Sequence, residues 1–370
     1  MKIFIDIGHP AHVHYFRHFT TIMKEKGHSI YITARDKEVT FSLLDFYKLP
    51  FANRGKGKKG ILGKLFYIFQ ADLFLIRKAL RIKPDVFLSF GSPYAAHTAW
   101  LLRKPHIAFD DTDHNVFEHL MYVAFTKSIL TPAVYKKDYG QKQVRFNGFM
   151  ELCSLHPNRF TINSEGLSEA LQTHKSGLYI ILRFVSWEAS HDIGLSGLSM
   201  AEKYALVREL SKYAAVIISS ESVLPNDLQK YGYSVHPARM HDLLAGAQLL
   251  VSESLTMSAE SAFLGTPTIC ISTARAGTLD EEVKLGLIEL FRTSEGVIER
   301  AIEIVKNPAI KPAFRLKSAT VVKELIDVTA FMTWFVENYP ESSNELKRNP
   351  SYQLNFKNSA IGSPLNLTHN

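Results

Sequence analysis

The chain has 370 residues, of which 46% are hydrophobic and 21% are charged, and only two of them are cysteines, Cys153 and Cys270. This composition suits two globular domains better than one, excludes a disulfide framework and favours a reducing compartment. The formal net charge of +7 favours anionic partners, namely phosphates, nucleic acid or lipid headgroups, and does not choose among them.

The amino-terminal stretch MKIFIDIGHP lacks the long apolar core of a signal peptide. No stretch of the chain approaches the ~20 uninterrupted apolar residues that a membrane-spanning helix requires. We therefore expect a cytoplasmic protein.

Short β-branched runs alternate with amphipathic helical segments, which is typical of parallel α/β units. Each half of the chain predicts one doubly wound sheet. The predicted strands are 2–7, 28–34, 85–90, 106–109 and 128–131 in the first half, and 177–182, 215–220, 233–236, 248–252 and 266–272 in the second. A polar linker around residues 150–177 separates the predicted domains, which are an amino-terminal domain 1–155, a second domain 176–310, closing helices 311–340 and a loosely ordered tail 341–370.

The first predicted strand runs into the loop GHPAHVHYF, which places four histidines, His9, His12, His14 and His18, within ten residues. A helix is predicted to begin near Val13. His14 and His18 then lie on the partly buried surface of that helix, and His9 and His12 lie in the loop before it. A loop imidazole near neutral pKa suits proton transfer, which makes His12 the candidate general base. No carboxylate or cysteine stands at ligand spacing, so no metal site is expected.

Three segments together resemble the GT-B glycosyltransferases, particularly the N-acetylglucosaminyl transferase of peptidoglycan synthesis. They are the loop GHPAHVHYF, the stretch 54–115 with its basic-apolar helix and acidic loop, and the segment 243–272, which ends in Glu-x-x-x-x-Gly-x-Pro. The chain is most similar to an uncharacterised GT-B-like family that carries LRF-x-x-W-x-A-x-HD and TM-x-x-E, which read LRFVSWEASHD and TMSAE here. This resemblance covers residues 1 to about 335. It implies two Rossmann-like domains facing a central cleft.

In the second domain, Ser254 and Thr256 end a predicted buried strand and open a helix, where amides and hydroxyls suit a diphosphate. Glu260, one turn later, is placed to accept hydrogen bonds from ribose hydroxyls, as the matching glutamate does in the resembling enzymes. The alternative is that Thr256 only caps the helix and that Glu260 is a solvated acid.

Three further residues complete the predicted donor site. Arg183 is placed to clamp a phosphate and Ser186 to donate beside it. His241 begins a helix at the level where GT-B proteins hold the nucleotide base, although a capped surface helix explains the same letters.

The resemblance assigns the acceptor to the first domain, with Gly8, His9, Gly91 and Asp113 on the acceptor side and Asp111 beside His12 as a catalytic residue. The triplet at 111–113 has the form of a metal-binding Asp-x-Asp motif. GT-B enzymes generally work without a catalytic metal, so these acids are interpreted as acceptor-side groups.

The stretch KGKKGILGKLFYIF, residues 56–69, combines lysines with an apolar stripe. The plain interpretation is a core-facing helix with a solvated flank, and the alternative is a patch that binds the inner-membrane surface.

These observations predict a glycosyltransferase that moves a sugar from a nucleoside-diphosphate sugar such as a UDP-sugar to an unknown sugar or lipid-linked acceptor in cell-surface polysaccharide or glycolipid synthesis. We expect no cofactor and no nucleic-acid partner. One alternative is a nucleotide-sugar 2-epimerase of the same fold, although those enzymes have arginine and glutamate around the loop proline where this chain has His9 and Ala11. Another alternative is a non-catalytic protein that binds sugar nucleotides or a membrane surface.

Overall fold

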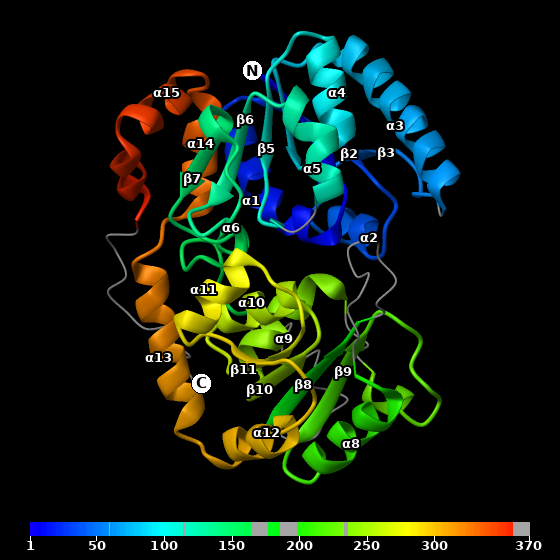
Figure 1. The fold of residues 1–370 in the computed structure, drawn as a ribbon, viewed down its shortest axis with the longest axis vertical. Coiled ribbons are helices and arrows are strands. Elements are labelled where there is room, and N and C mark those ends of the chain that lie inside the picture. Colours follow the sequence, from blue (N-terminus) through cyan, green and yellow to red (C-terminus); the bar gives the residue numbers. More distant parts are fainter. Residues whose placement is uncertain (59, 114–115, 164–176, 186–197, 233–235, 358–370) are drawn as a thin grey trace. The chain divides into compact units, whose positions relative to one another are not determined.

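The structure is a computed structural model that describes the whole chain except residues 59, 114–115, 164–176, 186–197, 233–235 and 358–370. The chain forms two compact units (Figure 1). Unit 1 consists of Met1–Arg159 together with the returning segment Leu325–Asn358, and unit 2 of Phe160–Glu324.

Unit 1 contains a seven-stranded sheet in which every neighbouring pair is parallel, in the order β3-β2-β1-β4-β5-β6-β7. Its central strands are continuous apolar runs because both faces of the sheet are covered. The strands are β1 (Lys2–Ile7), β2 (Ser29–Ala34), β3 (Phe51–Asn53), β4 (Val86–Phe90), β5 (His106–Phe109), β6 (Ser128–Pro132) and β7 (Gln143–Phe146).

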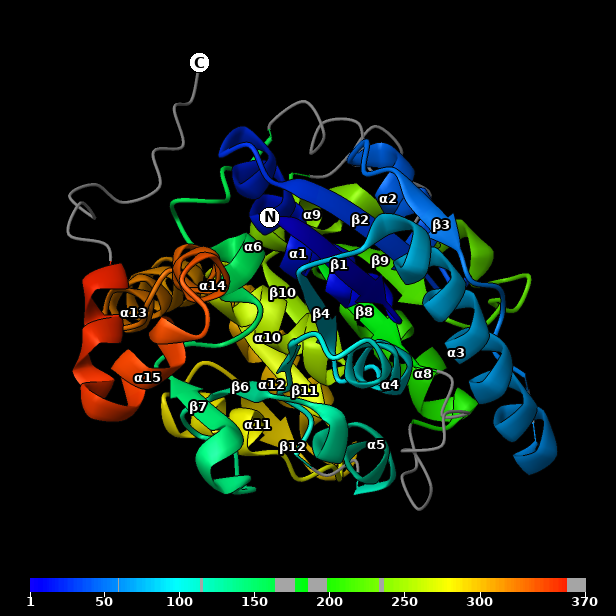
Figure 2. The ribbon, with the colours of Figure 1, turned by 90° about the horizontal axis from the view of Figure 1, so that it is seen from above.

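Helices cover the two faces of this sheet. Ala108 packs with Ala96 and Tyr122 from α4 and α5, whereas the next residue, Phe109, meets Phe16 from α1, as the alternation of side chains along a strand requires. Figure 2 shows α3 beside α4. The helices of unit 1 are α1 (Pro10–Glu25), α2 (Thr40–Phe46), α3 (Ile61–Ile82), α4 (Pro93–Leu101), α5 (Val116–Tyr122), α6 (Leu152–Leu155), α14 (Val328–Glu337) and α15 (Glu341–Arg348).

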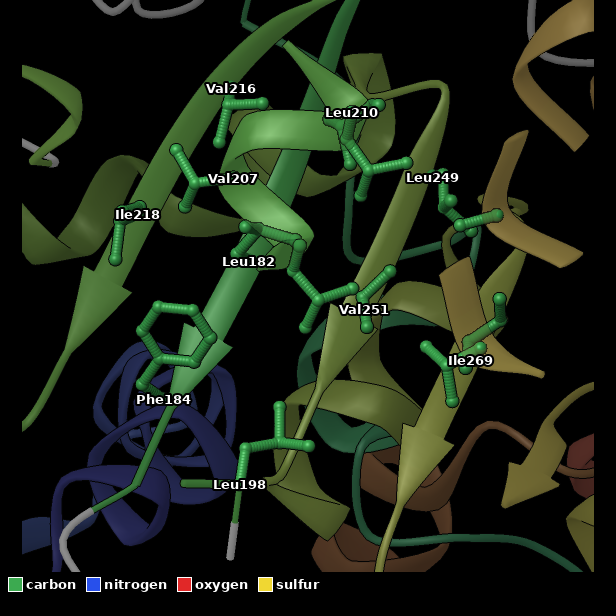
Figure 3. Packing of buried hydrophobic residues seen from close by; sticks show 14 of the residues in the cluster. Leu182, Phe184, Leu198, Val207, Leu210, Val216, Ile218, Leu249, Val251 and Ile269 are labelled. Carbon is green, nitrogen blue, oxygen red and sulfur yellow. The ribbon is translucent and has the colours of Figure 1, made fainter. Parts of the chain in front are cut away.

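Unit 2 contains a five-stranded parallel sheet in the order β12-β11-β10-β8-β9. Leu182, Val251 and Ile269 come from three neighbouring strands and pack with Val207 and Leu210 of α8 (Figure 3). The strands are β8 (Tyr179–Phe184), β9 (Ala215–Ser220), β10 (Leu249–Ser252), β11 (Thr268–Ile271) and β12 (Glu289–Phe291). The helices are α8 (Met200–Leu210), α9 (Met240–Gly246), α10 (Leu255–Phe263), α11 (Gly277–Lys284), α12 (Val297–Lys306) and α13 (Ile310–Lys323).

The direction of strand addition reverses once in each sheet, and parallel α/β sheets bind ligands at the carboxyl ends of the strands that flank such a reversal. In unit 1 the reversal lies between β1 and β4, so the loops at Gly8–His9 and Gly91–Ser92 mark the expected site. In unit 2 it lies between β8 and β10, which are followed by Val185 and by Glu253–Ser254. The predicted doubly wound α/β class is thus confirmed for both units.

Four boundaries differ from the sequence prediction. The first helix begins at Pro10 rather than near Val13, because His9 caps it and proline suits its first turn. The closing segment divides between the units, since α13 belongs to unit 2 and α14 to unit 1. The tail prediction is wrong for residues 341–357, where α15 and the 3₁₀ turn Pro350–Phe356 are ordered by the stacking of Tyr352 on Trp334. The linker was predicted at 150–177, but its first residues form the buried helix α6 of unit 1, and that unit extends to Arg159. The rest of that linker from 164 to 176, and positions 233–235 of the predicted strand 233–236, lie outside the described residues.

Candidate functional site

The loop after β1 is held by its own histidines. His9 caps α1, and its Nδ1 accepts a hydrogen bond from the amide of Ala11 at 3.3 Å. His12 lies in the first turn of α1, and its Nδ1 accepts from the amide of Gly8 at 3.3 Å while its ring packs 4.8 Å from the ring of Phe90. The predicted acceptor-side residues Gly8 and His9 are therefore part of one tightly hydrogen-bonded turn.

This geometry argues against His12 as the general base. Because Nδ1 accepts a hydrogen bond, the neutral ring carries its proton on Nε2 and is a donor there. Desolvation of the ring, followed by the positive charges of Lys37 and Arg54, lowers the pKa of His12 to about 3. A group with so low a pKa takes up a proton poorly at neutral pH, so the chemistry that the ring can perform here is hydrogen-bond donation.

The other two histidines of the cluster lie on α1, as predicted, but His14 is buried rather than on the helix surface. His14 is 8% exposed, and its Nδ1 lies 3.4 Å from the hydroxyl of Tyr47. His18 lies one turn later, and burial together with the charges of Arg17 and Arg159 lowers its pKa to about 4.

The acidic loop after β5 contains the residues that the sequence assigned to the acceptor side. Asp110 is buried and accepts hydrogen bonds from the hydroxyls of Tyr122 and Tyr135, with His119 at 2.9 Å. Sequence reasoning missed this residue, because only the Asp-x-Asp spacing of its neighbours was considered. Through these contacts, Asp110 holds the loop against Tyr122, Tyr135 and His119.

Asp111 is the partly exposed acid of this loop. Desolvation and the adjacent charge of Asp110 raise its pKa to about 7, although Thr112 donates a hydrogen bond to it at 2.9 Å. Asp113 is only 5% exposed and accepts from the amide of Lys136 at 3.2 Å, which gives it a structural bond. Asp111 is thus the carboxylate of the loop that is suited to exchange protons near neutral pH.

Gly91, on the other side of the switch point, adopts a φ of 58° that favours glycine, and a Cβ there would lie 3.3 Å from the ring of Tyr122. Beneath the same loops, the buried carboxylate of Asp6 accepts from Arg54 Nε at 2.9 Å and Ser92 Oγ at 2.6 Å. Sequence reasoning missed Asp6 and Arg54. The signal available for Asp6 was an acid inside the apolar strand IFIDI.

In unit 2, Ser254 is the residue that caps α10, because its Oγ accepts from the amide of Met257 at 3.3 Å. Thr256 lies in the first turn and is not the cap, which corrects that interpretation of the sequence. The positive end of this nine-residue helix begins directly after β10 at the switch point.

Glu260 is a buried acid rather than a solvated one. It is 7% exposed and lies 3.2 Å from Nε2 of His241, which comes from α9 and is 3% exposed. The structure therefore brings together two of the predicted donor residues at the helix that Ser254 caps. A buried carboxylate with one imidazole partner retains acceptor capacity for hydroxyl groups.

Arg183 is the last residue but one of β8 and is already engaged, donating to Ser219 Oγ at 3.0 Å and to Glu221 Oε1 at 2.5 Å. Ser186, predicted beside it, lies outside the described residues. The buried carboxylate of Glu253, which sequence reasoning missed, accepts from the amides of Val185 at 3.0 Å and Leu198 at 2.6 Å.

The described residues contain no group of three or more histidine, cysteine, aspartate or glutamate side chains that is arranged to hold a metal ion. In the same part of the chain, no helix is both long and apolar enough to cross a membrane. Cys153 and Cys270 are buried and unpaired.

Comparison with solved structures shows the GT-B arrangement of two Rossmann-like sheets. The UDP-GlcNAc 2-epimerase of Neisseria meningitidis, solved with UDP-GlcNAc bound, matches with a TM-score of 0.60 and 11% identity over 85% of this chain and 94% of that one. The glycosyltransferase SsfS6 of Streptomyces sp. SF2575 matches with a TM-score of 0.56 and 14% identity over 90% of this chain and 99% of that one.

Sequence comparison gives a more specific relationship. An uncharacterised protein of Methanocaldococcus jannaschii is 23% identical over 285 residues, which are 73% of this chain and 81% of that protein. A family model described as "Protein of unknown function (DUF354)" matches residues 1–283. With that match extending over both switch points, the chain belongs to the DUF354 family.

Proposed function

We propose that this protein is a glycosyltransferase that moves a sugar from a nucleoside-diphosphate sugar, with UDP as the nucleotide, to a hydroxyl-bearing acceptor in the synthesis of a cell-surface polysaccharide or glycolipid. The observation that carries the proposal is Asp111, a partly exposed carboxylate whose pKa is raised to about 7. Sugar transfer to a hydroxyl needs one proton acceptor of this kind. The GT-B fold shared with UDP-sugar enzymes supports the same conclusion at the level of architecture.

In the proposed reaction, unit 2 binds the donor. The ribose hydroxyls donate to Glu260, which His241 orients, and the diphosphate lies at the amino-terminal end of α10 near Ser254 and Thr256. The negative charge that develops on the leaving diphosphate is stabilised by the positive end of that helix.

Unit 1 supplies the acceptor chemistry. Asp111 takes the proton of the attacking hydroxyl, and His12 donates a hydrogen bond from Nε2 to a substrate oxygen. The role of general base thereby passes from His12 to Asp111, since the group that must accept a proton needs a pKa near the working pH.

The second candidate function is a nucleotide-sugar 2-epimerase, which the likeness to the epimerase from Neisseria meningitidis favours. Inversion of a carbon centre requires a C–H bond to break, whereas transfer to a hydroxyl does not. The flanks of Pro10, which are His9 and Ala11, favour the transferase over the epimerase.

Two measurements separate these candidates. Thermal unfolding in the presence of UDP and of UDP-sugars tests donor binding, because a ligand of the native state raises Tm. Incubation of the best-binding UDP-sugar in D₂O, followed by mass spectrometry, tests for C–H cleavage. Tm stabilisation without deuterium in the sugar, and release of UDP that depends on an added acceptor, are the expected results; deuterium at carbon 2 would favour the epimerase. No binding of any nucleotide would contradict both enzyme proposals.

A further inference from the structure

Two neighbouring acids after β5, Asp110 and Asp111, have different surroundings. Asp110 is 5% exposed, whereas Asp111 is partly exposed. Thr112 joins them, because its amide donates to Asp110 Oδ1 at 2.8 Å and its hydroxyl donates to Asp111 Oδ1 at 2.9 Å. Two carboxylates at one site repel each other when both are ionised, so one of the pair keeps a proton to a higher pH than the other. The contacts of each acid decide which one it is.

Among the described residues, each hydrogen-bonding partner of Asp110 is a donor. Its Oδ2 accepts from the hydroxyls of Tyr122 and Tyr135, the second at 3.0 Å, and lies 2.9 Å from Nε2 of His119. Burial and the charge of Asp110 raise the pKa of both tyrosines above its usual value, so their hydroxyls stay protonated and able to donate. With the amide of Thr112 on Oδ1, both oxygens accept hydrogen bonds, which stabilises the ionised form of this acid.

His119 is a donor to Asp110 because of the lysine on its other side. Lys137 Nζ lies 2.7 Å from Nδ1 of His119. An ammonium group can only donate, so Nδ1 accepts and the neutral ring carries its proton on Nε2, which faces Asp110. His119 is 6% exposed on α5, and Lys137 lies in the segment after β6. The network therefore joins the segments that follow two neighbouring strands, β5 and β6.

The other titratable groups of this network and its surroundings are Asp113, Glu118, Tyr139 and Cys153. Asp113 raises the pKa of Asp111 more weakly than Asp110 does. Burial raises the pKa of Tyr139 to about 12 and that of the Cys153 thiol well above its usual value, so both groups are neutral. Glu118 is exposed, and solvent screens its charge. The charge that acts most strongly on Asp111 is therefore that of Asp110.

We propose that His119 is a positioning residue that determines which of the two acids carries their shared proton. By donating to Asp110 it stabilises the negative charge there, and the proton stays on Asp111, the acid that is partly exposed. In the proposed transferase, Asp111 loses this proton to solvent near neutral pH and then accepts the proton of the attacking hydroxyl. The use of Asp111 in transfer rests on the proposed function, whereas the location of the shared proton does not.

The test is nuclear magnetic resonance of the full chain, labelled with ¹³C at the aspartate carboxyl carbons, because these signals report each proton without a substrate. Asp110→Asn and Asp111→Asn each remove one signal and thereby assign it. His119→Leu removes the donor, and His119→Gln replaces it with an amide that can still donate to Asp110. Asp138→Asn removes an exposed acid after β6 and is the control for the loss of one negative charge.

We expect the Asp111 signal of the wild type to titrate at about pH 7. Its midpoint should fall by about one pH unit or more in Asp110→Asn, because the neighbouring charge is gone. In His119→Leu the midpoint should fall in the same direction while the Asp110 signal begins to titrate, since the proton then passes to Asp110. A merely structural role of His119 would not move the proton from one acid to the other. His119→Gln and Asp138→Asn should keep the wild-type midpoint.

An Asp111 midpoint in His119→Leu equal to that of the wild type would overturn the proposal, as would an equal fall in Asp138→Asn. The ring ¹⁵N shifts of His119 in the wild type give a test that does not depend on the folding of a variant. A proton on Nε2 supports the proposal, and an Nε2 without a proton would overturn it. UDP binding is measured in parallel: a wild type that binds no UDP would contradict the transferase and leave the location of the proton unaffected.

Discussion

At the scale of single residues, the donor assignment depends on a buried carboxylate. Replacing Glu260 by glutamine keeps the size of the side chain but removes the charge that accepts from ribose hydroxyls. We expect Glu260→Gln to weaken UDP binding by ~1–3 kcal/mol, the range for a hydrogen bond to a charged group, while the fold is retained. Titration calorimetry with UDP measures the loss. Glu209→Gln removes a partly exposed acid of the same unit and is expected to bind UDP normally. A Glu260→Gln protein with wild-type affinity would show that Glu260 does not hold the ribose.

The acceptor side makes a kinetic prediction at the same scale. Asp111→Asn should lower kcat by roughly 10²–10⁴-fold with little change in donor affinity, because a general base acts mainly in the transition state. The wild-type rate should rise with pH through about 7 as Asp111 ionises, and this rise should be absent from the variant. Asp45→Asn, an exposed acid on α2, is the matched control. If Asp111→Asn keeps both the rate and the pH profile of the wild type, Asp111 is not the base, and His9 and Asp113 become the candidates.

The sequence identified the loops after β1 and β5 as candidate sites. It could not predict which residue in these loops is best suited to accept a proton. The spacing of His12 and Asp111 identifies titratable groups that follow strands, yet their pKa values depend on neighbours far along the chain. Lys37 and Arg54, which lower the pKa of His12, come from the segments after β2 and β3. Burial and long-range charge are therefore the reason why we propose Asp111 rather than His12 as the base.

At the scale of elements, strands with a strong apolar signal were predicted to within a residue or two, and β5 and β9 were predicted with the bounds that the structure has. The strands that were missed, β3, β7 and β12, have three or four residues each. So short a run has too few side chains to show a pattern, and pairing with a neighbouring strand defines it. The start of α1 was also misplaced, because the helix begins at Pro10 and not near Val13 as predicted.

Helix α3 carries the element-scale prediction. Phe66 and Phe69 are 57% and 67% exposed, and Lys58 Nζ lies 4.0 Å from the centre of the Phe66 ring. Aromatic side chains beside lysines suit the surface of an anionic bilayer, so we propose that this face binds the membrane. Of the other lysines in the predicted patch, Lys59 and the side chain of Lys64 lie outside the described residues.

Sedimentation with vesicles tests this face. Binding to acidic vesicles should be strong at low salt, fall as salt rises and decrease in the double variant Phe66→Ser, Phe69→Ser. Leu316→Ser removes an exposed apolar residue, 70% exposed on α13 of unit 2, and should bind as the wild type does. Equal binding to neutral and acidic vesicles, or to neither, would leave α3 as an ordinary solvated helix.

At the scale of the whole molecule, two doubly wound sheets follow from the alternation of strand and helix signals, which is a local property of the sequence. The return of the chain to unit 1 is not local. Asp327 caps α14 and also bonds Arg159 Nε at 3.3 Å, so residues 168 positions apart close the unit. The predicted tail is held in the same way, because Gln353 Oε1 accepts from the amide of Asn147 at 2.6 Å. Composition alone does not reveal such a bond and therefore made this ordered segment look like a tail.

The same unit predicts how stability depends on pH. Desolvation lowers the pKa of four histidines in unit 1, to about 3 for His12 and His106, to about 4 for His18, and below its usual value for His156. Between about pH 6.5 and pH 4 the unfolded chain binds protons that the folded unit does not, so the free energy of unfolding should fall as the pH falls. Each histidine contributes up to about 1.4 kcal/mol per pH unit in that window, and Asp111, whose pKa is raised, offsets part of the loss.

Urea unfolding between pH 7.5 and 5 measures this slope. In a Trp187→Phe background the remaining tryptophans, Trp100 and Trp334, both belong to unit 1, so their fluorescence reports on that unit. His106 is fully buried between Ser89 and Thr126. Replacing it by glutamine removes one group that binds a proton only in the unfolded chain, so the dependence of the free energy of unfolding on pH should become less steep. His236→Asn, in unit 2, should leave it unchanged. A free energy of unfolding that stays flat or rises from pH 6.5 to 5 would show that these rings are protonated within the folded unit, and would restore His12 as a group able to accept a proton.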